Sequence, residues 1–171
     1  MRLTMAPLVL AIIALGVSGV GANVDTICKA ASDKDELVGY QFCITLLANS
    51  NGDAWGLAKA AAYLGVKSTY IAIKDIKGLL AKLGTDAKKK AVLEQCNGFY
   101  GSIKFAFANA RDRINKRNYA TGKEEATKAI SLAHQCDDIL ETAIVPSPLW
   151  QQSFSSIQTT IVCRAITNLI E

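Results

Sequence analysis

Histidine is almost absent from this sequence, because His134 is the only one in 171 residues. A single imidazole cannot supply the ligand set of an ordinary zinc site, and no serine or cysteine triad can be assembled around it. We therefore interpret His134 as a structural residue. We expect no catalytic residue, no metal and no cofactor, so the function should lie in a binding surface.

The sequence also lacks a large net charge, alternating apolar and polar runs, and sites for N-linked glycosylation. The chain has 19 lysine and arginine residues against 15 aspartate and glutamate residues, a formal charge of only +4. The basic residues are spread along the chain rather than clustered, so we expect no nucleic-acid partner. No run alternates between apolar and polar residues, which disfavours β-strands. No Asn-x-Ser/Thr triplet occurs, so the chain has no acceptor for N-linked glycosylation.

Residues 1–22 are typical of a secretory signal peptide. Arg2 precedes an apolar run over residues 8–17, and residues 20–22 place small side chains before the expected cleavage point. The run is shorter than the roughly 20 apolar residues that span a bilayer, and no second run of that length follows. We expect cleavage after Ala22 and a soluble, secreted chain of residues 23–171 that forms a single domain with no membrane partner.

From residue 53 onward the apolar residues recur at helical spacing. The pattern predicts long helices over residues 53–83, 86–116 and 119–142, and a fourth from Pro148 to the C-terminus. On the last helix one side carries Trp150, Phe154, Ile157, Ile161, Ala165 and Leu169. Because short turns join the helices, we expect an all-α fold in which residues 53–171 form an up-down-up-down four-helix bundle.

The cysteines on the second and third long helices are placed to form a disulfide. The turn near Lys116 lies midway between Cys96 and Cys136 in the sequence. Residues equidistant from the turn of an antiparallel helical hairpin lie side by side, and both cysteines fall on apolar stripes. We predict a Cys96–Cys136 bridge, which lowers the entropy of the unfolded chain.

The remaining cysteines are at positions 28, 43 and 163. By elimination Cys28 pairs with Cys43, and this bridge staples residues 23–52 into a compact N-terminal helical hairpin. Cys163 is left as a free thiol. A helical wheel places it about opposite Phe154, so we expect it to be partly covered and away from the centre of the core.

Two apolar features outside the predicted core stripes are candidate partner contacts. Leu57, Leu64 and Ile71 recur every seven residues on one face of the 53–83 helix. Cover by the N-terminal hairpin is the more ordinary explanation for this stripe, since such positions are commonly buried within the chain. Phe105, on the next long helix, lies opposite the core stripe. Contact with a partner and cover by the N-terminal hairpin explain an aromatic ring at this position equally well.

The cysteine framework resembles that of a known family. The segments Ile27-Cys28 and Tyr40-Gln-Phe-Cys43-Ile-Thr-Leu46, the later pair Cys96 and Cys136, and Asn118-Tyr-Ala120 are similar to the pattern of the plant invertase and pectin methylesterase inhibitors. The resemblance covers the whole of residues 23–171. It implies a protein of the apoplast, the extracellular space of the plant cell wall, that docks over an enzyme's active-site cleft in a 1:1 complex.

The resemblance leaves two target enzymes open. Known invertase inhibitors carry Pro-Lys-Phe in the turn between the disulfide-linked helices, whereas the matching positions here are Arg117, Asn118 and Tyr119. Only the aromatic position is kept, which favours a cell-wall pectin methylesterase over a cell-wall or vacuolar invertase. These three residues are further candidate contacts. A third hypothesis, a helical carrier of an apolar ligand, is disfavoured because bulky residues fill the predicted stripes.

Overall fold

The computed structural model describes residues 23–84, 86–143 and 147–171, and these ranges contain six helices. They are α1 (Val24–Lys34), α2 (Tyr40–Leu47), α3 (Ala54–Lys82), α4 (Ala87–Asn115), α5 (Tyr119–Thr142) and α6 (Trp150–Thr167). The predicted bounds of α3, α4 and α5 agree with these to within one residue. The predicted signal peptide, residues 1–22, lies outside the described residues.

Polar side chains determine where the three longest helices begin. Asp53, Asp86 and Asn118 each accept a hydrogen bond from the backbone N–H three residues later, at 2.8, 3.1 and 3.4 Å. Each bond satisfies one of the donors that the first turn of a helix leaves unpaired. The caps therefore stop α3, α4 and α5 from extending backwards into the turns and keep these turns short.

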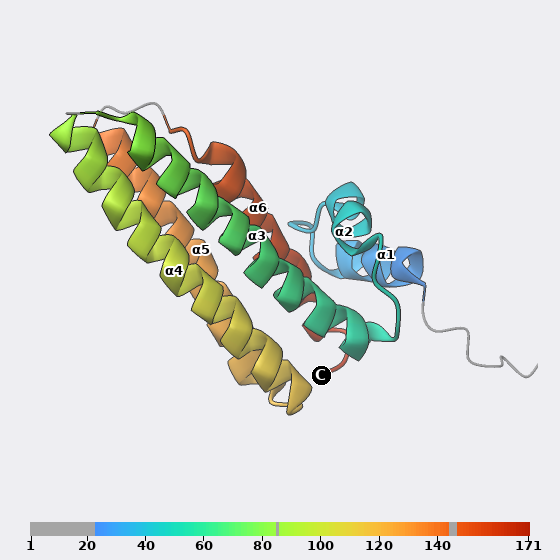
Figure 1. Cartoon of the computed structure of the whole chain (residues 1–171). Helices are drawn as coiled ribbons and strands as arrows, with labels where there is room; N and C mark the ends of the chain where they lie inside the picture. The colour runs from blue at the N-terminus through green and yellow to red at the C-terminus, as the bar shows by residue number, and fades with distance from the viewer. Residues whose placement is uncertain (1–22, 85, 144–146) are drawn as a thin grey trace, which may run out of the picture.

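Helices α3 to α6 form the predicted four-helix bundle (Figure 1). Helix α3 packs against α4 and α6, and α5 packs against the same two helices, so α4 and α6 lie diagonally opposite each other. The hairpin of α1 and α2 lies beside one half of the bundle and contacts α6 and α3 (Figure 1). The predicted all-α architecture, a bundle preceded by a helical hairpin, is confirmed.

The structure contains both predicted disulfides. Cys28–Cys43 joins α1 to α2 and Cys96–Cys136 joins α4 to α5, with Cα–Cα distances of 5.7 and 5.0 Å. All four of these cysteines are fully buried. Neither bridge links the hairpin to the bundle, so non-covalent contacts hold these two parts together.

The buried core has two parts along the length of the bundle. The first lies between the hairpin and the nearer half of the bundle, and it includes Leu47, Leu57, Ile114, Val162 and Ile166. The second surrounds the Cys96–Cys136 bridge, and it includes Ile76, Tyr100, Ile103, Phe107 and Leu140. Between them Gly65 allows α3 to approach α4 closely, since a Cβ atom at that position would lie 2.5 Å from the Phe107 ring.

Leu57, one of the candidate partner contacts, is not accessible to a partner. Leu57 is fully buried, in the same cluster as Leu47 of α2. Leu64 is half-buried and packs against this cluster. The alternative explanation, cover by the N-terminal hairpin and its neighbours, therefore holds for this end of the stripe. Ile71 lies two turns further along α3 and remains 57% exposed.

The predicted core stripe of α6 is only partly right, because Ile161 and Ala165 are buried but the two aromatic residues of the stripe are not. Trp150 and Phe154 are 62% and 53% exposed, whereas Cys163 is only 1% exposed and is part of the core. The physical reason is that α6 contacts α3, α5 and both hairpin helices, so most of its surface is covered. Buried threonines such as Thr160 and Thr167 satisfy their hydroxyl groups on carbonyls of their own helix, at 2.9 and 2.7 Å.

Candidate functional site

The turn between α4 and α5 carries the three residues that align with the invertase-inhibitor motif. Arg117 has a left-handed backbone, with φ of 58°. Its guanidinium donates a hydrogen bond to the Tyr119 hydroxyl at 3.1 Å. Asn118 caps α5, and Tyr119 is half-buried against the hairpin end of the core. Of the three, Arg117 and Asn118 are exposed to a partner, and Asn118 and Tyr119 also have structural roles.

Phe105 is 64% exposed on α4. The Nζ atom of Lys104 lies 5.2 Å from the centre of its ring. One and two turns earlier, Gly101 and Gly98 have no neighbouring atom within 4 Å of the position that a Cβ would take. The ring of Phe105 therefore projects from an open helix surface and is not covered within the chain, so a partner can reach it.

The three residues of the predicted α3 stripe do not form one surface. Leu57 is buried and Leu64 is half-buried. Ile71 lines a shallow pocket of about 230 Å³ between α3 and α6, together with Gln151 and Ser155 of α6. This pocket lies across α3 from α4, so Ile71 and Phe105 do not belong to the same contact face.

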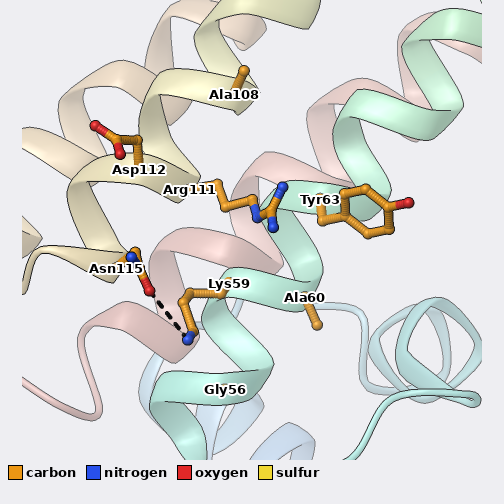
Figure 2. Close-up of a pocket in the computed structure, with 8 residues that line it drawn as sticks. All are labelled: Gly56, Lys59, Ala60, Tyr63, Ala108, Arg111, Asp112 and Asn115. Atoms are coloured by element: carbon orange, nitrogen blue, oxygen red, sulfur yellow. Dashed lines mark hydrogen bonds between the residues drawn. The ribbon is translucent and has the colours of Figure 1, made fainter.

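A larger groove of about 510 Å³, which the sequence analysis missed, lies between the N-terminal half of α3 and the C-terminal half of α4 (Figure 2). Small residues give it depth: Gly56, Ala60 and Ala108 have no side chain long enough to fill it. The remaining lining residues are polar or aromatic, namely Lys59, Tyr63, Arg111, Asp112 and Asn115. Ala108 lies one turn from Phe105 on α4, so the groove adjoins the exposed ring.

Cations cover the two aromatic rings beside this groove. Lys59 Nζ lies 3.2 Å from the centre of the Trp55 ring, and the Arg117 guanidinium lies 4.9 Å from it. The Tyr63 ring has Arg111 at 5.1 Å and Lys67 at 5.9 Å. Such cation–π contacts contribute about 0.5–1 kcal/mol each at exposed sites. They also hold the long side chains in defined positions.

The spacing of residues on α3 indicates part of these cation–π stacks in the sequence. Trp55, Lys59, Tyr63 and Lys67 follow one another at intervals of four residues, which places them on one face of α3. The alternation of aromatic and basic residues could have identified the face. It could not have shown that arginines from α4 and the following turn complete each stack.

The described residues contain no arrangement suited to catalysis. His134 is exposed, and no group of three or more histidine, cysteine, aspartate or glutamate side chains in residues 23–84, 86–143 and 147–171 could hold a metal ion. Burial raises the pKa of the Cys163 thiol to about 12. A thiol with so high a pKa is a poor nucleophile at neutral pH, and its Sγ atom lies 3.7 Å from the Ala58 carbonyl oxygen.

Comparison with known proteins identifies the relatives of this chain. It is 43% identical to pectinesterase inhibitor 8 of Oryza sativa subsp. japonica, over 90% of this chain and 86% of the relative. It is 37% identical to pectinesterase inhibitor 12 of the same plant, over 97% of this chain and 86% of the relative.

Solved structures show the same fold. A mutant form of a pectin methylesterase inhibitor from Arabidopsis superposes with a TM-score of 0.69 at 17% identity, covering 85% of this chain and 95% of that one. The sequence model of the plant invertase/pectin methylesterase inhibitor family matches residues 22–166. The chain therefore belongs to the plant invertase/pectin methylesterase inhibitor family, whose members are inhibitors of enzymes and not enzymes themselves.

Proposed function

We propose that this protein inhibits a plant cell-wall pectin methylesterase by docking over the active-site cleft of the enzyme in a 1:1 complex. One observation carries the proposal: two relatives at 43% and 37% identity, matched over most of both chains, are named pectinesterase inhibitors. Relatives this similar over their whole fold commonly keep the same class of partner, which a likeness of fold alone would not indicate.

The conformation of the α4–α5 turn supports a pectin methylesterase over an invertase. The first residue of the invertase-inhibitor motif is proline, whose ring locks φ near −65°. Arg117 occupies that position with φ of 58°, and its N–H donates a hydrogen bond to the Ile114 carbonyl at 3.0 Å. A proline fits neither the backbone angle nor the hydrogen bond, so this turn is not built to present that motif.

A site of action outside the cell follows from the same proposal. Arg2 and the apolar run over residues 8–17 are typical of a signal peptide, and two disulfides persist in an oxidising compartment such as the apoplast. The alternative of an apolar-ligand carrier has less support. The largest groove described above is lined by Lys59 and Arg111, which suit an apolar ligand poorly.

The decisive test is to titrate the oxidised protein separately against a plant pectin methylesterase and an acid invertase. We expect inhibition of the first enzyme at equimolar protein and no inhibition of the second. Potent inhibition of the invertase, with none of the pectin methylesterase, would overturn the proposal.

Substitution of the exposed aromatic residue on α4 tests how the complex forms. If Phe105 contacts the enzyme, Phe105→Ala should weaken inhibition by about 2 kcal/mol, or thirtyfold, because a buried aromatic anchor is lost from the complex. Its melting temperature should hardly change, since the ring is exposed in the free protein. Trp150→Ala is the control, because it removes a similarly exposed ring from the diagonally opposite helix α6. Equal losses in both variants would argue against a contact at Phe105.

A further inference from the structure

We infer that the groove between α3 and α4 is a binding site for an acidic oligosaccharide, namely the de-esterified backbone of pectin. This choice of ligand rests on the proposed function, because pectin methylesterase converts neutral methyl esters on the sugar units into carboxylates. The inhibitor would then bind the polymer that its target enzyme produces, through a site of its own.

The charge of the groove is the first argument. Two cations line it, Lys59 from α3 and Arg111 from α4. Two more lie on the aromatic rings that these two contact, Arg117 on Trp55 and Lys67 on Tyr63. None of them takes part in an ion pair among the described residues, where five other lysines do. The cations therefore keep their charge available for an anionic ligand.

The carboxylate beside the groove does not neutralise it. Asp112 lines the groove, but it pairs at 2.9 Å with Lys116, the residue that caps the C-terminus of α4. Figure 2 shows the Asp112 carboxylate directed away from Lys59 and Tyr63. The site keeps a net positive charge. Coulomb attraction therefore lowers the free energy of an anion that enters it.

The cations are held in place before a ligand arrives. Lys59 lies on the Trp55 ring and also donates a hydrogen bond to the Asn115 side-chain oxygen at 3.3 Å, as Figure 2 shows. Arg111 lies over the Tyr63 ring. An ordered cation loses less side-chain entropy on binding than a freely rotating one, so each ion pair with a ligand contributes more.

The uncharged groups of the groove suit a sugar. Oxygen Oδ1 of Asn115 accepts from Lys59, which leaves the two amide N–H donors of Asn115 free for sugar hydroxyls. Tyr63 is 46% exposed, and its ring lies 5.1 Å from the Arg111 guanidinium. Ala60 and Ala108 leave room for a sugar ring. An acidic peptide could also satisfy the cations; the sugar is the preferred ligand because the proposed target enzyme produces it.

Binding of a de-esterified oligogalacturonate to the purified, oxidised protein, with no enzyme present, tests the inference. Isothermal titration calorimetry at low ionic strength should detect binding that weakens as salt is added, because exposed charges are screened. The double variant Lys59→Ala with Arg111→Ala should bind about tenfold more weakly, the loss expected for two exposed charge pairs. Lys77→Ala with Lys82→Ala removes the same charge from exposed positions further along α3 and should bind as the parent does.

Two other ligands identify what the groove recognises. The fully methyl-esterified oligosaccharide keeps the sugar and removes the charge, and polyglutamate keeps the charge and removes the sugar. We expect neither to bind as tightly as the oligogalacturonate. Equal binding of polyglutamate would overturn the inference, because it would indicate a surface for an acidic protein. No binding of oligogalacturonate, or an equal loss in the control variant, would also overturn it. Inhibition of pectin methylesterase is measured separately, so these failures would leave the proposed function standing.

Discussion

The close approach of α3 and α4 at Gly65 gives the sharpest prediction about stability. Gly65 is buried within α3, and a Cβ atom there would lie 2.5–2.6 Å from three atoms of the Phe107 ring. The ring belongs to a fully buried side chain and has no open space to move into. We therefore expect Gly65→Ala to force α3 and α4 apart or to push the ring out of its preferred rotamer.

The expected change in the free energy of unfolding is the difference between two contributions. Overpacking a well-packed core costs about 1–3 kcal/mol. Alanine in the interior of a helix gains about 1 kcal/mol over glycine, which partly offsets that cost. The net loss for Gly65→Ala should be about 1 kcal/mol, or 2–4 °C in melting temperature for a chain of this size.

A second glycine of the same helix isolates the clash. Gly78 is exposed, and nothing lies within 4 Å of the position that its Cβ would take. Gly78→Ala should therefore gain stability from helix propensity alone. The two variants should differ by about 4–8 °C in melting temperature, measured by circular dichroism. In a chain that also carries Phe107→Leu, Gly65→Ala should no longer lower the melting temperature. If Gly65→Ala melts as high as Gly78→Ala in the parent chain, the packing argument fails.

Three further predictions follow from the turn and the cysteines. Replacing both Cys96 and Cys136 by serine should lower the free energy of unfolding by about 4 kcal/mol, measured by urea denaturation, because their loop no longer constrains the unfolded chain; an unchanged midpoint would contradict this. Arg117→Pro should cost about 3 kcal/mol and lower the melting temperature, since proline cannot adopt a positive φ or donate to Ile114; an unchanged melting temperature would refute the described turn. Cys163 should not react with Ellman's reagent at pH 8 until denaturant is added, because burial raises its pKa to about 12; rapid reaction of the native protein would show that it is accessible.

Much of the fold could be predicted from local rules. Long apolar stripes and capping residues such as Asp53 and Asn118 mark the helix bounds, because a helix begins where a side chain can satisfy its unpaired backbone donors. The position of Cys96 and Cys136 on either side of one turn was enough to pair them. Both signals are local in sequence, so a single chain contains them in full.

The sequence is least informative about faces whose cover comes from distant elements. Leu57 is buried partly because the hairpin lies against α3, and no pattern within α3 encodes that contact. On α6 the large residues Trp150 and Phe154 are exposed, while Thr160 is buried with its hydroxyl bonded to its own helix. A hydrophobicity stripe treats that threonine as polar, so it identifies the buried Ile161 and Ala165 but also assigns the exposed Trp150 and Phe154 to the core.

The groove could be predicted only in part for the same reason. Trp55 and Lys59 are neighbours on one helix, and their spacing is visible in the sequence. Arg111 reaches Tyr63 only because α4 packs antiparallel to α3 at one particular register. That register depends on side-chain packing such as the contact of Gly65 with Phe107, which has no periodic signal.

The placement of the two disulfides has a consequence for oxidative folding. Each bridge joins helices that follow one another directly in the chain, with sequence separations of 15 and 40 residues. Either bridge can therefore form from a local helical hairpin before α6 has docked, and neither needs the other to bring its cysteines together. The two single-bridge species should both be native-like intermediates that collect in parallel, and the buried Cys163 thiol has little opportunity to exchange with either bridge once α6 has packed.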